Sequence, residues 1–236
     1  MSYKRIILPR EERSRGQLTS DMAGIGMHFN AFPNREANIE DTIYFASIDG
    51  MIGKDLRTLS VMVKWLESYY RWINVGRLTK IVSCCEHDRV KAFWTAVAIW
   101  KNTDIRFKKL SQIYKGPRVE VIMPPFDSSY HYMKHGENRR FSDGPLGVPA
   151  NVLRDREMDV VPPDKTAIDN LFVRYRIMMG PTYRSDMWAA LQINPDLTPA
   201  ELARQTYGSF PVAWQVKNDW EIVRHGRRRR KKKNIA

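Results

Sequence analysis

Cysteine is almost absent from this sequence of 236 residues, which has only the neighbours Cys84 and Cys85. Adjacent cysteines suit neither an ordinary disulfide nor, with only His87 nearby, a zinc site. Long apolar runs are absent too, since none approaches the ~18–20 residues that span a bilayer. Near the N-terminus only residues 6–8 are apolar, too few for the hydrophobic core of a signal peptide. These absences predict a cytoplasmic protein with reduced thiols and no membrane partner.

Common catalytic fingerprints are also missing. The sequence contains no G-x-x-x-x-G-K-[ST] loop, no G-x-S-x-G elbow and no G-x-G-x-x-G motif. His131 and His135 have a metal-ligand spacing but lack the glutamate of the HExxH zinc motif. We therefore expect no catalytic residue, no metal and no cofactor. One alternative stays open, a metal-dependent nuclease. Its candidate residues are Glu120, Asp127, Asp159 and Lys165.

Acidic residues are outnumbered by basic ones, 26 against 39, which gives a formal net charge of +13. Seven of the basic residues form one run near the C-terminus: Arg227, Arg228, Arg229, Arg230, Lys231, Lys232 and Lys233. Such an excess favours nucleic acid or another anionic surface as partner, although Lys and Arg can also serve only solubility. We interpret residues 226–236 as a basic tail.

The first half of the chain divides into two parts. Residues 1–50 contain scattered Gly, Pro and Asn without a sustained period, and we expect an irregular segment. Residues 51–115 predict a helical bundle, because apolar positions recur every three or four residues from Leu56 to Ile73. A short helix capped by Asn74 and a third helix starting near Asp88 follow. This trio also fits a degenerate helix-turn-helix. Its aromatic residues could stack on bases, but their helical spacing favours core packing: Tyr69, Tyr70, Trp72, Phe93, Trp94 and Trp100.

Residues 116–164 lack the helical spacing of apolar residues seen before them, and they predict a β-containing insert or linker. A strand is expected over residues 119–123, closed by two prolines. The alternation around Tyr130 and Tyr132 suggests a small hairpin. A domain boundary is expected near residue 160, followed by a helix over residues 166–179 that Gly180 ends. Another helix is expected over residues 183–193. The last domain would cover residues 165–225.

Three local signals then define one helix start. Thr198 and Glu201 form a capping box, and Pro199 occupies the first helical position, where its missing N–H costs nothing. Leu197 and Leu202 stand where a hydrophobic staple would. Gly208 is expected to break this helix, and Ser209 to cap the next one, over residues 210–222. A spacing of about 100° per residue places Val212, Val216 and Val223 on its inner face, with Ala213 and Trp220 beside them.

The stretch LTPAELARQTYGSFPVAWQVKNDW, with YRSDMWAALQI before it, resembles the helix-turn-helix of bacterial winged-helix regulators. The resemblance covers residues 183–223, and the remainder resembles uncharacterised bacterial proteins. The hairpin wing of that family is replaced here by the charged tail. The family places the second helix of the pair in the major groove. By position, the resemblance then makes these residues base readers: Trp214, Gln215, Lys217 and Asn218. We also predict contacts with the DNA backbone from Ser209, Arg204 and, because of their charge, the seven basic residues of the tail.

The sequence as a whole predicts a mainly α protein with a small β component, an N-terminal helical bundle and a C-terminal winged-helix-like trihelical domain. Its expected function is sequence-specific binding of double-stranded DNA, as in a bacterial transcriptional regulator. An alternative is the antitoxin or regulatory partner of a toxin–antitoxin or phage-defence operon. Two further partners stay open: a second copy of the chain, and a protein bound by the N-terminal helices.

Overall fold

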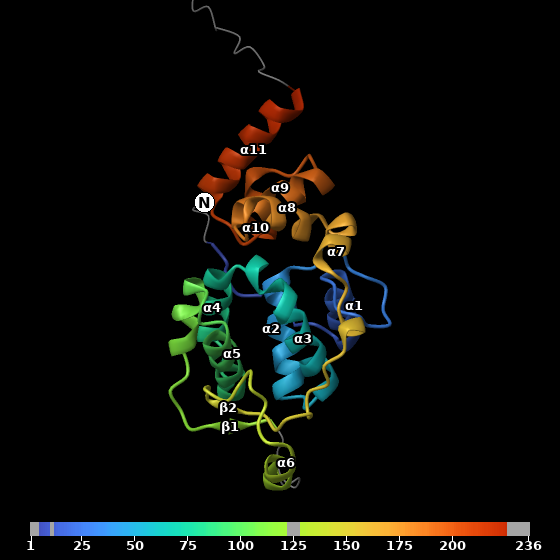
Figure 1. The fold of residues 1–236 in the computed structure, drawn as a ribbon. Helices are drawn as coiled ribbons and strands as arrows, with labels where there is room; N and C mark the ends of the chain where they lie inside the picture. The colour runs from blue at the N-terminus through green and yellow to red at the C-terminus, as the bar shows by residue number, and fades with distance from the viewer. Residues whose placement is uncertain (1–4, 10–11, 122–127, 226–236) are drawn as a thin grey trace, which may run out of the picture. The chain divides into compact units, whose positions relative to one another are not determined.

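The structure is a computed structural model that describes residues 5–9, 12–121 and 128–225 (Figure 1). The chain divides into two compact units. The N-terminal unit is Leu8–Arg174, and the C-terminal unit combines Met1–Ile7 with Tyr175–Ala236. Both consist mainly of helices, so the predicted fold class is confirmed at this level. The division after residue 174 differs from the predicted start of the last domain at 165, and residues 8–174 form one unit rather than several.

The N-terminal unit is built from helices joined by short segments. Its helices are α1 (Arg15–Gly24), α2 (Ile39–Met51), α3 (Leu56–Tyr69), α4 (Val75–Ser83), α5 (Asp88–Trp100), α6 (Ser128–His135) and α7 (Pro163–Asp169). Its 3₁₀ turns are η1 (Tyr70–Trp72), η2 (Ile105–Lys108), η3 (Leu110–Gln112) and η4 (Glu157–Asp159). The three helices predicted between residues 51 and 115 are confirmed as α3, α4 and α5, and the Asn74 side chain caps α4 as expected. Within the described residues, no helix has the length and apolar character to cross a membrane.

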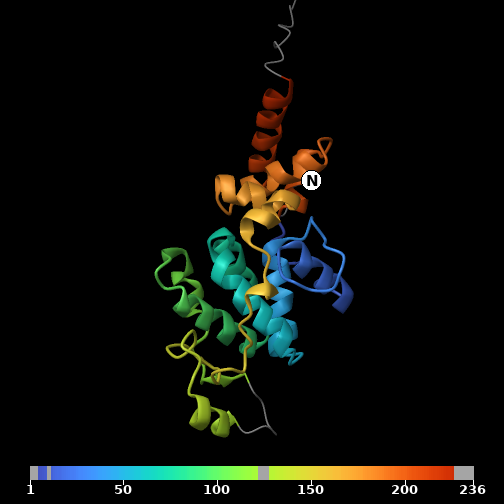
Figure 2. The ribbon, with the colours of Figure 1, turned by 45° about the vertical axis from the view of Figure 1, so that its right-hand side comes forward.

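Helix α2 is the centre of the N-terminal unit and packs against α1, α3, α4 and α5 (Figures 1 and 2). None of its residues is exposed. Gly50 lets α3 come close, because a Cβ at this position would lie 3.0 Å from the Cβ of Leu59. The prediction of an irregular segment over residues 1–50 is therefore wrong. The half-buried side of α2 carries Tyr44, Phe45 and Ile48 beside Asp49, so the sequence lacks the continuous polar stripe that reveals a surface helix.

Two carboxylates enter the interior with the first turn of α2. Glu40 and Asp41 are 0% and 2% exposed, and Arg77 of α4, 1% exposed, pairs with Asp41 at 2.5 Å. The same guanidinium lies 3.8 Å from Glu40 and donates to Asn38 at 2.8 Å. Glu40 also accepts the backbone N–H of Asn74 at 2.8 Å. Because desolvating a charge is costly, these partners are what makes the burial of α2 possible.

The β component is small. Strand β1 (Val119–Glu120) pairs in parallel with β2 (Leu146–Gly147), with Val119 opposite Leu146. The strand predicted over residues 119–123 is confirmed for its first two residues, and its last two lie outside the described residues. The hairpin predicted around Tyr130 is wrong, because these residues form α6. Tyr132 is half-buried between exposed neighbours. A single inward position is compatible with either a strand or a short helix.

The C-terminal unit contains most of α8 (Leu171–Met179), then α9 (Tyr183–Ile193), α10 (Pro199–Gln205) and α11 (Phe210–His225). The single helix predicted over residues 166–179 is instead α7 and α8, interrupted at Asn170. This buried amide donates to the carbonyl of Gly24 at 2.7 Å and accepts the N–H of Val173 at 3.0 Å, which starts a new helix. Gly180, with φ +82°, ends α8 as expected.

The predicted helix starts at Tyr183 and Pro199 are both confirmed. Thr198 accepts the N–H of Glu201 at 3.3 Å, and the Glu201 carboxylate accepts the N–H of Thr198 at 2.9 Å. Bonds from the Thr198 hydroxyl and then from its backbone N–H lower the pKa of Glu201. The contribution of this carboxylate is therefore present above its unfolded pKa and is lost as the pH falls through the lowered, folded value.

We expect Arg77→Met to lower the free energy of unfolding by about 3–5 kcal/mol, because it leaves two buried carboxylates without their cation. Urea denaturation at neutral pH measures this difference. Lys80→Met is the matched control, since Lys80 is exposed on the same helix. A decrease for Arg77→Met as small as that of the control would contradict the stabilising role of the cluster.

We expect Thr198→Ala to cost about 1 kcal/mol, because α10 loses its capping hydroxyl. Thr198→Ser keeps that hydroxyl and should retain most of the stability. Gln205→Ala, at an exposed position of the same helix, serves as the control. Denaturant titrations of the three variants measure the free energy of unfolding. If Thr198→Ala and Thr198→Ser lowered it equally, the capping hydroxyl would contribute nothing to stability.

Candidate nucleic-acid interface

Helices α9, α10 and α11 pack against one another and form the trihelical part of the C-terminal unit. The turn between α10 and α11 has one unexpected feature. Tyr207, rather than Gly208, has the left-handed backbone conformation, with φ +59°. At Gly208 the Cε of Met187 on α9 occupies the space that a Cβ would take. The first helix of the trio therefore packs against the backbone of the turn through the Met187 side chain.

Arg5 also holds this turn, although no sequence motif points to it. Its Nε donates to the carbonyl of Tyr207 at 2.9 Å, and its guanidinium lies 4.3 Å from the ring centroid of Tyr183. The guanidinium thus binds the strained residue of the turn and the first residue of α9 together. A local sequence pattern cannot reveal a contact between residues 202 positions apart.

Helix α11 buries a different line of residues from the one predicted. Ala213 and Val216 are fully buried, and the half-buried ring of Trp220 lies 5.5 Å from that of Trp188 on α9. Val223, expected on the inner face, is 73% exposed. The reason is that the C-terminal end of α11 continues beyond α9 and α10 (Figures 1 and 2). Residues 213, 216 and 220 are spaced by three and four and form the true packing face.

The four predicted base readers are not equivalent in the structure. Trp214 is 57% exposed and Gln215 is exposed, whereas Asn218 is half-buried. Lys217 is half-buried, and its ammonium is engaged within the protein. Its ammonium donates to the carbonyl of Pro195 at 2.5 Å and lies 3.3 Å from the Glu221 carboxylate. Lys217 follows Ala213 by one turn and so lies beside the packing face, where the loop before α10 is within reach.

The predicted backbone contacts also fall into separate groups. Arg204 is exposed on α10. Ser209 directly precedes α11, and its carbonyl accepts the N–H of Ala213 at 3.0 Å, as at the start of a helix. The seven basic residues of the tail lie outside the described residues. The structure therefore places Arg204 and Ser209 on either side of the turn.

Charge over the described residues of the C-terminal unit after residue 174 is largely compensated internally. Arg176 and Asp186 form a buried bidentate pair with distances of 2.7 and 2.8 Å. Arg184 of α9 pairs with Asp219 of α11 at 2.6 Å. Over residues 175–225 the sequence has five basic and five acidic residues. A polyanion would therefore be attracted mainly by charges outside this segment, such as the predicted tail.

Two of the four residues considered for a nuclease have other partners, and Lys165 is exposed. Glu120 accepts the Tyr132 hydroxyl at 2.5 Å, and Asp159 pairs with Arg154 at 2.9 Å. Asp127 lies outside the described residues. Across the part of the chain that the structure describes, no group of three or more His, Cys, Asp or Glu side chains is placed to hold a metal ion.

Comparison with known proteins adds no relative to this picture. No protein-family model matches the chain, no curated protein is significantly similar to it, and no solved structure matches its fold.

Proposed function

We propose that the protein binds double-stranded DNA sequence-specifically and acts as a bacterial transcriptional regulator, with α11 as its recognition helix. The observation that carries the proposal is the geometry of α11. The helix follows a capped helix after a short turn and packs through residues 213, 216 and 220, while Trp214 and Gln215 stay exposed. A recognition helix needs this division between a face that packs and a face that reads.

The exposed residues have suitable chemistry for direct readout. Gln215 and Asn218 carry amides that can pair bidentately with adenine in the major groove. Arg204 would contact phosphate from α10. Base recognition by Lys217 would require its ammonium to leave both Pro195 and Glu221. The proposal therefore assigns base readout to Trp214, Gln215 and Asn218.

The wing of the winged-helix family is replaced in this proposal by the basic tail. The seven consecutive basic residues supply the positive charge that residues 175–225 lack. Each phosphate that they neutralise would release counterions, so binding would depend steeply on salt.

The triple variant Trp214→Ala, Gln215→Ala and Asn218→Ala should lose sequence preference. Each good bidentate pair contributes about 1–3 kcal/mol of discrimination against a wrong base. Selection from random duplexes by the purified protein, followed by sequencing, measures the preference. Asn30→Ala, an exposed amide in the N-terminal unit, is the control. The proposal fails if the wild-type protein enriches no sequence, or if the triple variant enriches the same sequences as wild type.

Removal of residues 226–236 should weaken binding to all duplexes about equally, because phosphate contacts carry no sequence information. The slope of log K against log salt should fall by about 0.9 for each phosphate that the shortened chain no longer binds. Fluorescence anisotropy over a salt series gives both quantities. If affinity at moderate salt were unchanged after the deletion, the tail would have no part in binding.

A further inference from the structure

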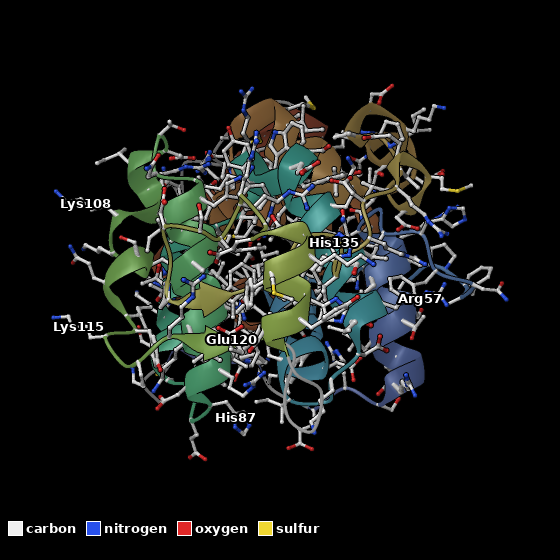
Figure 3. All side chains as sticks on the ribbon, turned by 60° about the horizontal axis from the view of Figure 1, so that its bottom comes forward. Arg57, His87, Lys108, Lys115, Glu120 and His135 are labelled. Atoms are coloured by element: carbon white, nitrogen blue, oxygen red, sulfur yellow. The ribbon has the colours of Figure 1, made fainter. Side chains whose placement is uncertain are left out.

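The N-terminal unit has a strongly basic surface of its own. Residues 101–118, which follow α5, contain six basic residues and one acidic residue. Five of the six are exposed; Arg106 and Arg118 form ion pairs, and we call the other three, Lys108, Lys109 and Lys115, the basic face. Figure 3 shows Lys108 and Lys115 on the same edge of the molecule, both pointing away from the ribbon. Within the described residues, none of the three forms an ion pair with a carboxylate.

The 3₁₀ geometry of η2 and η3 explains why these lysines point outward. Three residues complete each turn, so positions three apart lie on one side. Phe107 and Leu110 are fully buried, and Ile113 packs against the same core. Lys108 and Lys109 lie between Phe107 and Leu110 in sequence and therefore must face outward. The sequence pattern thus separates an apolar inner side from a cationic outer side.

The segment that carries the basic face is held firmly against α5. Thr95 donates its hydroxyl to the carbonyl of Leu110 at 3.4 Å and accepts the N–H of Tyr114 at 3.2 Å. Arg106 donates to the carbonyl of Ile73 at 3.3 Å, which ties η2 to the start of α4. The lysines are therefore presented by an ordered backbone, which lowers the entropic cost of binding a ligand.

The one carboxylate in the segment is already engaged. Asp104 pairs with Arg106 at 2.6 Å, and this bond is the main cause of the lowered pKa of Asp104. The pair forms at the start of η2 and leaves Lys108, Lys109 and Lys115 uncompensated. A partner with regularly spaced negative charges would supply the missing anions.

The surroundings of the basic face favour a phosphate backbone over a protein or unpaired bases. A protein interface needs an apolar centre, and the only large exposed apolar side chain within residues 101–118 is Ile105. The adjacent aromatic rings do not offer a free stacking platform. The ammonium of Lys101 lies 3.7 Å from the ring centroid of Trp100 and 4.5 Å from that of Tyr70. Readout of unpaired bases needs such rings to be accessible.

We propose that the basic face of the N-terminal unit binds the phosphate backbone of duplex DNA without reading its sequence. The proposal stands on the N-terminal unit alone and does not depend on α11 or on the basic tail. Its ligand is the regular array of phosphates on a double helix, where three lysines can replace condensed counterions.

The test is a charge reversal in the full chain, Lys108→Glu with Lys109→Glu and Lys115→Glu. Its matched control reverses three other exposed cations of the same unit: Lys134→Glu, Arg156→Glu and Lys165→Glu. Both variants change the net charge equally. Anisotropy with a short labelled duplex of mixed sequence, from about 50 to 200 mM salt, measures affinity and salt slope.

The basic-face variant should bind roughly tenfold or more weakly at low salt, with a slope reduced by about 2–3, while the control stays within about twofold of wild type. Equal decreases in both variants would show a general charge effect and overturn the proposal. Unchanged binding by the basic-face variant would overturn it as well. If the charge reversal weakened binding to single-stranded or duplex RNA but not to duplex DNA, the ligand would not be DNA.

The same measurements separate this proposal from the one for α11. The basic-face variant should keep the sequence preference of wild type, because the lysines contact no base in this proposal. The alanine variant of Trp214, Gln215 and Asn218 should keep its affinity for mixed-sequence duplex. If sequence preference were absent in every variant and the basic face still mattered, only the function proposed for α11 would fail.

Discussion

The N-terminal unit depends on the burial of α2, and that burial depends on one guanidinium. Glu40 and Asp41 enter the core with the first turn of this helix, and Arg77 from α4 is the cation beside both. Because α2 packs against four other helices, the ion cluster fixes more than one pair of elements. Charged groups that must meet their partners make the arrangement specific.

The C-terminal unit and the segment after α5 differ in how their charges are compensated. In the C-terminal unit, ion pairs join its own elements, such as Arg176 with Asp186 and Arg184 with Asp219. These pairs stabilise the helix contacts and cancel the local field. In the N-terminal unit, the segment after α5 leaves lysines without carboxylates. Electrostatic attraction and base readout would therefore come from different parts of the chain, so salt and sequence should affect binding separately.

Local signals in the sequence are sufficient where the physical cause is local. Thr198 and Glu201 cap each other across one helical turn, so their motif predicts α10 directly. Helix α2 cannot be found in this way, because its half-buried side is also largely apolar and the helix shows no clear amphipathic period. The inner face of α11 depends on how far α9 and α10 extend, which leaves Val223 exposed. Lys217 binds the carbonyl of Pro195, a contact that the helix propensity of a lysine does not predict. The sequence therefore places the candidate site residues on the right helix, but not all of them with the right orientation.

The contact between Arg5 and Tyr207 makes the C-terminal unit discontinuous in sequence. During synthesis on a ribosome, Arg5 emerges long before its acceptor exists, whereas all of the N-terminal unit is complete once residue 174 has left the exit tunnel. The larger unit can therefore fold first, before the Tyr207 carbonyl that accepts from Arg5 has been synthesised. The turn before α11 receives its guanidinium only when the helices on both sides of it have been made. Assembly of the candidate DNA-reading surface thus joins residues made before the N-terminal unit with residues made after it.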